Sequence, residues 1–445
     1  MRTNALLSLF KPVLLSLILT ASPLISHSEP ARGFDVNDVT FVFPLNQKNQ
    51  TKAYPDVALN NGKGGQILSA SLFSKIDHQA HKLSQMDSRY PLKDWRVVAL
   101  RYDPCFPKSA LAPETCLEQI RLIAQPFSGS GFQDVSMHLL FQISEGARTP
   151  NARILNSLLA IKNLSAAKTQ GVPLVVHPGL EDELKKYARV NGPVAEQLLQ
   201  LIKTYGQQKN LKEVTFTDAD FNNNGPWFFM GGRIEKENWV LDPIPGVKNK
   251  ALLQTTDENG FISDNVPAEN IGITPFMTFD DQGLGIKQTL AESEVYRLHR
   301  TENPKFANPR NTDCASCHVV ASKQFAFKLD DKESSYLFRS PVGITGYSLA
   351  SNHPNGHSGL GTSEVVRVLG YSMQSAIITP LAAASSALVA SQLNTFLKLP
   401  PPTTRDCRGQ EAALKFCLLG FDNSALLNSP VDTKACFDQH CRNSN

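Results

Sequence analysis

The chain has 445 residues, of which 41% are hydrophobic and 19% charged, a composition typical of ordinary soluble globular proteins. Its 44 basic and 41 acidic residues give a formal net charge of +3 at pH 7. This charge balance indicates neither a nucleic acid nor an anionic membrane surface as a partner. The length is enough for about two or three domains of roughly 150 residues each.

Residues 1–28 have the layout of a secretory signal peptide. Arg2 and Lys11 supply positive charge, and an apolar core follows over residues 12–20. The small residues Ser26 and Ser28 then occupy the two positions that a signal peptidase recognises. The apolar core is shorter than the roughly 20 residues of a membrane span, so we expect cleavage after Ser28 rather than an uncleaved anchor. The sequence offers no later run that is long and apolar enough to cross a membrane. The predicted location is therefore periplasmic or secreted.

Residues 29–285 contain blocks of strand patterns and helix patterns. Three segments with alternating side chains are followed by three with apolar residues at i, i+3 and i+4, and then by three further strands. The expected strands cover residues 95–102, 119–127, 135–144, 213–217, 227–235 and 238–241, and the expected helices cover residues 151–163, 180–189 and 193–205. This order predicts an α+β domain with a mostly antiparallel sheet. It lacks the motifs of nucleotide-binding loops, serine hydrolases and zinc proteases, so its role is not indicated.

Two weaker patterns in this domain resemble metal sites. His78 and His81 are one helical turn apart in IDHQAH and could meet on one face, although lone histidines are more often surface residues. The stretch FTDADFNNNG has the acidic character of a calcium loop. Its glycine, however, comes at the eighth position instead of the sixth, and Phe229 stands where a bidentate Glu is needed. We expect an Asx-rich turn between two strands there.

Six of the eight cysteines are candidates for disulfides, because cysteines of exported proteins tend to be paired. Cys105 and Cys116 flank the connection between the first two expected strands, where a disulfide would staple a hairpin. The tail, residues 401–445, contains Cys407, Cys417, Cys436 and Cys441. We expect this tail to be a disulfide-stapled cap, with three connectivities open.

The other two cysteines, Cys314 and Cys317, belong to a C-x-x-C-H motif that ends at His318. The two intervening residues separate the thiols so that they can add to the two vinyl groups of a porphyrin, and the adjacent imidazole is placed under the iron. A zinc corner would need a second pair of ligands, for which His353 and His357 are conceivable. A redox pair would need a preceding strand, and NPKFANPRNTD is not one. Covalent haem attachment is the favoured interpretation over these two and over chance.

In this motif the chain resembles the c-type cytochromes. The resemblance implies thioether bonds from Cys314 and Cys317 to one haem c, with His318 as the proximal iron ligand. It covers about residues 286–400, which are then expected to form a mainly α-helical region. The helical pattern at residues 288–299 ends well before the motif, whereas the familiar single-haem fold runs its first helix straight into it. The haem chemistry is thus better indicated than the standard cytochrome fold.

The second axial position of the iron has several candidates. Met373 lies in GYSMQSAIIT, a connection between a short helix expected at residues 363–369 and a helix expected at residues 380–397. Small single-haem cytochromes commonly place a methionine ligand in such a loop. His353 and, after it, His357 lie in a Gly- and Asn-rich loop that could also reach the iron. An open site is the remaining alternative.

These patterns together predict an exported electron-transfer protein that works with a redox partner protein in the periplasm or cell envelope. Two alternatives stay open: a haem-dependent oxidoreductase or peroxidase with an open distal site, and a non-catalytic binding module stabilised by haem or zinc. The coordination of the iron distinguishes them. The expected fold class is α+β, with an antiparallel sheet domain followed by the cytochrome c-like region and the disulfide-rich tail.

Overall fold

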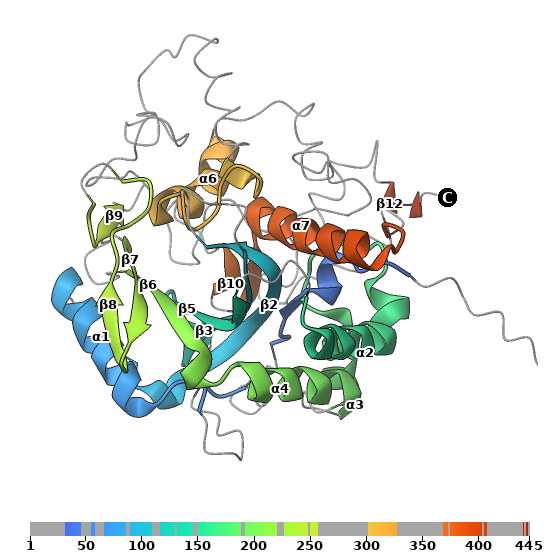
Figure 1. The fold of residues 1–445 in the computed structure, drawn as a ribbon, viewed down its shortest axis with the longest axis horizontal. Coiled ribbons are helices and arrows are strands. Elements are labelled where there is room, and N and C mark those ends of the chain that lie inside the picture. Colours follow the sequence, from blue (N-terminus) through green and yellow to red (C-terminus); the bar gives the residue numbers. More distant parts are fainter. Residues whose placement is uncertain are drawn as a thin grey trace, which may run out of the picture.

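A computed structural model shows the arrangement of the chain (Figure 1). It describes residues 32–45, 55–57, 66–85, 90–108, 116–129, 131–145, 150–187, 192–219, 227–247, 250–256, 301–326, 368–372, 374–402, 405–406, 439 and 442–443. The predicted signal peptide and the predicted domain boundary near residue 286 lie outside these residues. So do Met373, His353, His357 and the four cysteines of the tail.

One large antiparallel sheet organises the described part of the chain. Its main strand order is β1-β2-β3-β5-β6-β7-β8, with β4 paired to β3 and β9 paired to β7. The strands are β1 (Thr40–Val42), β2 (Trp95–Pro107), β3 (Cys116–Ser128), β4 (Gly131–Phe132), β5 (Ser136–Glu145), β6 (Leu211–Ala219), β7 (Trp227–Glu235), β8 (Asn238–Leu241) and β9 (Gln254–Thr256). All six predicted strands are confirmed, because alternation of apolar and polar residues is a local signal.

Helices surround this sheet (Figure 1). They are α1 (Ala70–Ser84), α2 (Ala152–Thr169), α3 (Pro178–Tyr187), α4 (Pro193–Tyr205), α6 (Cys314–Ala326) and α7 (Pro380–Leu397), with short 3₁₀ turns η1 (Val36–Asp38), η3 (Leu92–Asp94) and η4 (Gln208–Asn210). The helices predicted at residues 151–163, 180–189, 193–205 and 380–397 are all confirmed. α7 begins where its cap predicts, since the Thr379 side chain accepts a hydrogen bond from the Ala382 N–H.

The two faces of the sheet carry different side chains. Directly paired residues of neighbouring strands point to the same side, so the register defines a row on each face. One row is apolar and consists of Leu100, Leu122, Leu139 and Val214. The row on the other face is mostly charged and consists of Arg101, Arg121, Leu140 and Glu213.

Different helices cover the two faces. On the apolar side, α1 places His81 edge-on against Phe216, with ring centroids 5.9 Å apart. On the other side, His318 of α6 lies 4.8 Å from the ring of Phe229. Thr40, which pairs with Arg101, meets Ser386 of α7 at 2.7 Å on this same side. We call this second side, with Arg101, Arg121, Leu140 and Glu213, the α6 face.

The C-terminal part of the described chain returns to the sheet. β10 (Leu369–Ser372) and β11 (Ser375–Ile378) form a hairpin. The backbone of Tyr371 exchanges two hydrogen bonds with the Gln125 side chain, at 2.7 and 2.8 Å. The helix predicted at residues 363–369 is wrong at its last residue, since Leu369 already begins β10, where pairing with β11 fixes an extended backbone.

The predicted hairpin disulfide is present. Cys105 on β2 and Cys116 at the start of β3 are bonded, with Cα atoms 4.6 Å apart. Of the tail, the structure describes β12 (Arg405–Asp406) and β13 (Arg442–Asn443), which pair antiparallel. The described residues thus form a mixed α+β fold with a large antiparallel sheet, as predicted, while the cytochrome c-like region stays a prediction.

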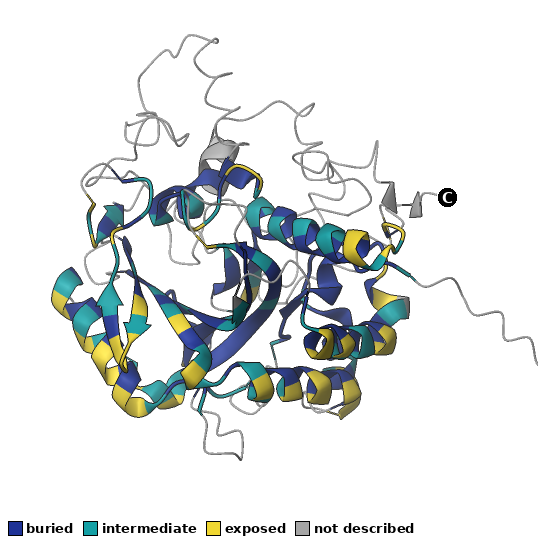
Figure 2. Ribbon diagram, in the orientation of Figure 1, coloured by how far each residue is buried: buried dark blue, intermediate teal, exposed yellow. Residues whose placement is uncertain are grey.

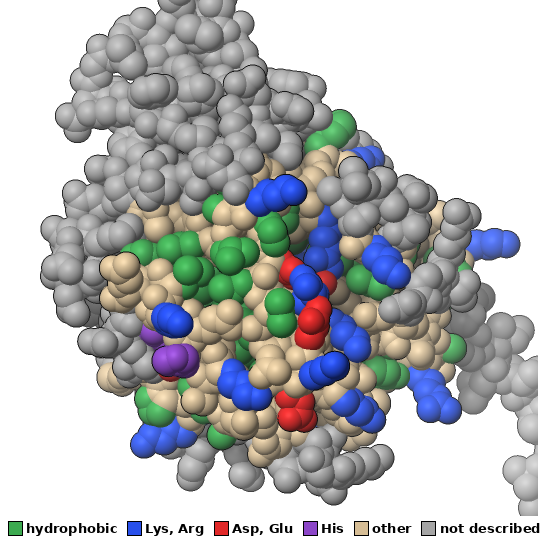
Figure 3. Space-filling model, turned by 60° about the vertical axis from the view of Figure 1, so that its left-hand side comes forward, with side chains coloured by type: hydrophobic (Ala, Val, Ile, Leu, Met, Phe, Trp, Pro, Cys, Tyr) green, Lys and Arg blue, Asp and Glu red, His purple; other side chains and the backbone are tan. Residues whose placement is uncertain are grey.

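Burial follows this architecture. The central strands are buried and α1 to α4 expose their outer sides (Figure 2). Lys and Arg side chains are dispersed over the face drawn in Figure 3 and do not gather into one patch there. Among the helices that the structure describes, none is long and apolar enough to cross a membrane.

Candidate functional site

The C-x-x-C-H motif forms the first turns of α6. Asp313 directly precedes the helix and is fully buried. Its Oδ2 atom accepts hydrogen bonds from the Ser316 N–H at 3.0 Å and from the Gln254 amide at 2.7 Å. The same Gln254 side chain accepts the Ala315 N–H at 2.9 Å. Two of the unpaired N–H groups of the first helical turn are thereby satisfied, so Asp313 and Gln254 fix where the motif begins.

The three motif residues lie on one side of the helix. Positions i, i+3 and i+4 of an α-helix are neighbours on its surface, and Cys314, Cys317 and His318 have this spacing within α6. His318 is only 7% exposed and packs against Phe229 of β7. Both cysteines are half-buried and carry free thiols. The structure therefore presents two thiols and one imidazole together toward the sheet.

A small apolar cluster supports this end of α6. It consists of Ala219, Trp227, Phe229, Ala315, Val319 and Val320, with Cys314 packed against it. Trp227 and Phe229 stack at 6.3 Å, and Phe229 in turn meets His318. The orientation of the imidazole is thus set by rigid aromatic contacts on β7.

Both thiols are held in the protonated form. Burial, and then the neighbouring Asp313 carboxyl, raise the pKa of Cys314 to about 12. Burial, Asp313 and Cys314 raise the pKa of Cys317, while the Arg121 guanidinium acts in the opposite direction. Raised values disfavour the thiolate, which is the form that binds zinc and attacks disulfides.

The segment before the motif is tied to the α6 face by Arg310. Its guanidinium bonds the Glu213 carboxylate of β6, and its Nε–H donates to the Pro107 carbonyl at 3.3 Å. It also lies 5.3 Å from the centre of the Phe106 ring, as does the guanidinium of Arg121. The motif is therefore built onto the sheet and is not carried on a separate lobe.

These residues fit a covalent haem by their donor set. Cys314 and Cys317 would hold the porphyrin, and His318 would be the proximal ligand to iron. The predicted distal ligands Met373 and His353 lie outside the described residues, so the structure does not bring them to the site or separate them from it.

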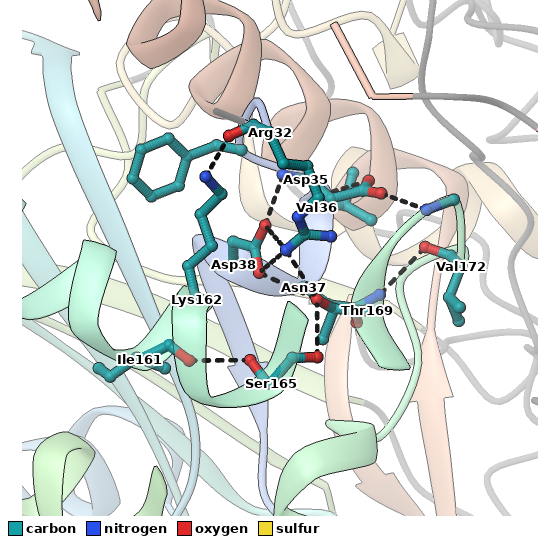
Figure 4. A network of polar contacts seen from close by, with 12 residues as sticks. Arg32, Asp35, Val36, Asn37, Asp38, Ile161, Lys162, Ser165, Thr169 and Val172 are labelled. Atoms are coloured by element: carbon teal, nitrogen blue, oxygen red, sulfur yellow. Dashed lines mark hydrogen bonds and ion pairs between the residues drawn. The ribbon is translucent and has the colours of Figure 1, made fainter. Parts of the chain in front are cut away.

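A second polar cluster, at the N-terminal end of the described chain, is a structural anchor. Arg32 bonds both carboxylate oxygens of Asp38, at 3.1 and 3.0 Å, and Thr169 of α2 bonds the same carboxylate at 3.1 Å (Figure 4). Lys162 donates to the Arg32 carbonyl. Burial, and then the nearby Asp38, raise the pKa of Asp35 to about 7. The network fastens residues 32–38 against α2.

The two histidines of IDHQAH, which could have met on one helix face, differ in burial. His78 is exposed, whereas His81 is buried and contacts two carboxylates, Asp77 at 3.2 Å and Asp218 at 3.5 Å. Burial lowers the pKa of His81, but the two carboxylates outweigh it and raise the value to about 10. Within the described ranges, no group of three or more His, Cys, Asp or Glu side chains could hold a metal ion.

The sequence patterns missed the residues around the motif, namely Gln254, Asp313, Arg121 and Arg310. Two of them carried a usable signal: Arg121 is a charged residue inside the otherwise apolar run IRLIA of a central strand, and Asp313 is an N-cap residue directly before a helix. Gln254 and Arg310 act through contacts between segments far apart in the chain. Comparisons of the chain with protein-family models, with curated proteins and with solved structures found no match.

Proposed function

We propose that the protein is an exported c-type cytochrome-like protein that binds one haem c covalently and transfers single electrons in the cell envelope. The observation that carries this proposal is the grouping of Cys314, Cys317 and His318 on one side of α6, with the imidazole buried against Phe229.

The protein's own groups suit the attachment step. Cys314 and Cys317 would hold the haem through thioether bonds, in which each thiol S–H would add across one vinyl group, with sulfur on one carbon and the hydrogen on the other. The Asp313 cap and the Gln254 amide hold the first helical turn, which keeps the two sulfur atoms and the imidazole in register. When bound, haem supplies a one-electron iron couple whose potential depends on axial ligands, burial and nearby charge. Electrons would pass to a redox partner protein in the periplasm or cell envelope.

The attachment is tested by making the exported protein with haem-maturation machinery and recording its spectrum after denaturing extraction. We expect haem to stay with the chain, and to be lost when Cys314→Ala and Cys317→Ala are combined. The matched control is Cys105→Ala with Cys116→Ala, which removes two cysteines elsewhere and should leave haem attached.

A colourless, folded wild-type protein would overturn the proposal. If haem is attached, oxidised and reduced spectra of the native protein identify the distal ligand. Loss of the methionine signature in Met373→Ala would assign that residue, and His353→Ala tests the histidine alternative in the same way. A five-coordinate haem that takes up carbon monoxide would favour the oxidoreductase alternative over electron transfer.

A further inference from the structure

We propose that His138 of β5 is the distal ligand of the haem iron, across from His318. The inference rests on the proposed function and gives the sheet of the α+β domain a role that the sequence left unassigned. It places a residue of this sheet where Met373 and His353 were expected from the sequence. With two imidazoles as axial ligands, the iron would be six-coordinate.

The side chain of His138 lies on the α6 face of the sheet. It stands two positions before Leu140 on β5, and alternate residues of a strand share one face. The imidazole of His318 comes from the other direction, since it leaves α6 toward the sheet and meets Phe229 of β7. One ring thus rises from the sheet and the other descends from the helix, as the two axial ligands of one iron do.

The segment that carries the C-x-x-C-H motif touches the α6 face at two places. At one of them, Arg310 bonds Glu213 of β6. At the other, His318 packs against Phe229 of β7, which pairs with Thr217 of β6. The two places are four positions apart along β6, which is about 13 Å. They define the stretch of the sheet that the motif segment crosses.

His138 lies within this stretch. Its partner on β6 is Thr215, midway between Glu213 and Thr217. Strand β5 is the direct neighbour of β6, so His138 is displaced sideways from that midpoint by about 5 Å. The sheet therefore presents an imidazole between the two contacts that hold the motif segment.

The surface beside His138 is low and accessible. Thr215 on β6 and its partner Gly231 on β7 continue the row that His138 begins, and all three residues are half-buried. The neighbours of His138 along β5, Met137 and Leu139, point to the apolar side and are fully buried. Small side chains next to an accessible imidazole are what a bulky planar group such as a porphyrin needs on that side.

The other possible ligands in the described part of the chain lie elsewhere. A c-type haem usually takes His or Met as its second axial ligand. The remaining described histidines and methionines are on α1 or on the apolar side of the sheet: His78, His81, His177, Met137 and Met230. Among these described side chains, His138 alone shares the α6 face with His318.

The first arm of the test uses the haem-loaded protein and records its spectra and reduction potential. For the wild type we expect a six-coordinate, low-spin haem with the signature of two histidines. In His138→Leu we expect a shift to high spin and uptake of carbon monoxide by the reduced iron. In His138→Met we expect the methionine signature to appear and the potential to rise, because Met raises the potential relative to His. A merely structural role of His138 would produce neither change.

The matched control is Gln142→Leu. Gln142 is a half-buried residue on the same strand and the same face, where it pairs with Gln119 outside the stretch that the motif segment crosses. We expect this variant to keep the spin state and the potential of the wild type.

The second arm uses the full chain with Cys314→Ala and Cys317→Ala, titrated with ferric protoporphyrin. We expect it to bind with a low-spin spectrum, and we expect this spectrum to be lost on adding His138→Leu and kept on adding Gln142→Leu. Urea unfolding of each haem-free chain shows whether it is folded. If the His138→Leu chain does not fold, His138→Met decides in its place, since it keeps a ligand of similar length.

Two kinds of result separate this inference from the proposed function. A five-coordinate wild-type haem, a distal signature that is lost in Met373→Ala or His353→Ala, or a folded His138→Leu protein with the wild-type spectrum would overturn the role of His138 and leave haem attachment intact. A wild-type chain without covalent haem would sink the proposed function. The second arm would then decide alone: binding of ferric protoporphyrin that depends on His138 would support the ligand, and binding independent of it, or none, would overturn it.

Discussion

At the scale of single residues, the most direct prediction concerns His81 and the dependence of the free energy of unfolding on pH. Its pKa is raised to about 10 in the folded protein by Asp218 and Asp77, against a usual value near 6.5. The stabilisation from the protonated ring is therefore complete below about pH 6.5 and is lost as pH rises toward 10. Over this window one linked proton gives a slope of at most about 1.4 kcal/mol per pH unit. We expect His81→Gln to flatten this part of the curve of unfolding free energy against pH, measured by urea denaturation.

The exposed neighbour His78 provides the control for this measurement. His78→Gln, at an exposed position of the same helix, controls for the exchange of a histidine for glutamine there. Asp35 also titrates near neutral pH, with its pKa raised to about 7, but it contributes equally in both variants. Identical slopes for wild type and His81→Gln between pH 6.5 and 10 would show that the histidine is not held protonated.

At the scale of single elements, the start of α6 depends on one cap. Asp313→Ala removes the acceptor of the Ser316 N–H, a loss of about 1 kcal/mol. It also leaves the buried Gln254 amide without its partner, which costs about 1–3 kcal/mol more. We expect the free energy of unfolding to fall by about 2–4 kcal/mol, and amide exchange at Ala315 and Ser316 to accelerate. Asp313→Asn keeps a capping oxygen and should cost clearly less. Equal losses for the two variants would contradict the capping role.

The sequence predicted the bounds of several single elements but not the contacts around the C-x-x-C-H motif. β7, β8, α4 and α7 have the predicted bounds, because alternation, Pro at a first helical turn and a Thr cap act within a few residues. The run SEVVRVL predicted a helix, but its last residue, Leu369, pairs with Ile378 of β11 and is therefore extended. The C-x-x-C-H motif could be recognised in the sequence. The contact between Gln254 and Asp313 beside it could not be predicted, because the two residues meet only after the chain has folded.

At the scale of the whole molecule, the C-terminal part completes the core of the sheet domain. The side chain of Asn394 bonds both the N–H and the carbonyl of Phe34, at 2.6 and 2.9 Å. Tyr371 and Gln125 are joined by two hydrogen bonds across 246 positions of sequence. Leu369, Ile378 and Leu393 belong to the same buried cluster as the strands of the sheet. Contacts of such separation leave no periodic trace in the sequence.

This arrangement predicts that the N-terminal part does not fold alone. A fragment of residues 29–285, which ends at the boundary predicted from the sequence, would expose the surfaces that α7 and the β10–β11 hairpin cover. We expect it to give no cooperative urea transition, whereas residues 29–445 should give one. In the full chain, Asn394→Ala should lower the free energy of unfolding by about 2–4 kcal/mol, because two backbone groups of Phe34 lose their partner. Thr395→Ala, at the exposed neighbouring position, should have little effect. A cooperative transition of the fragment would mean that the sheet domain is independent, and that α6 with the C-x-x-C-H motif and α7 merely dock on it.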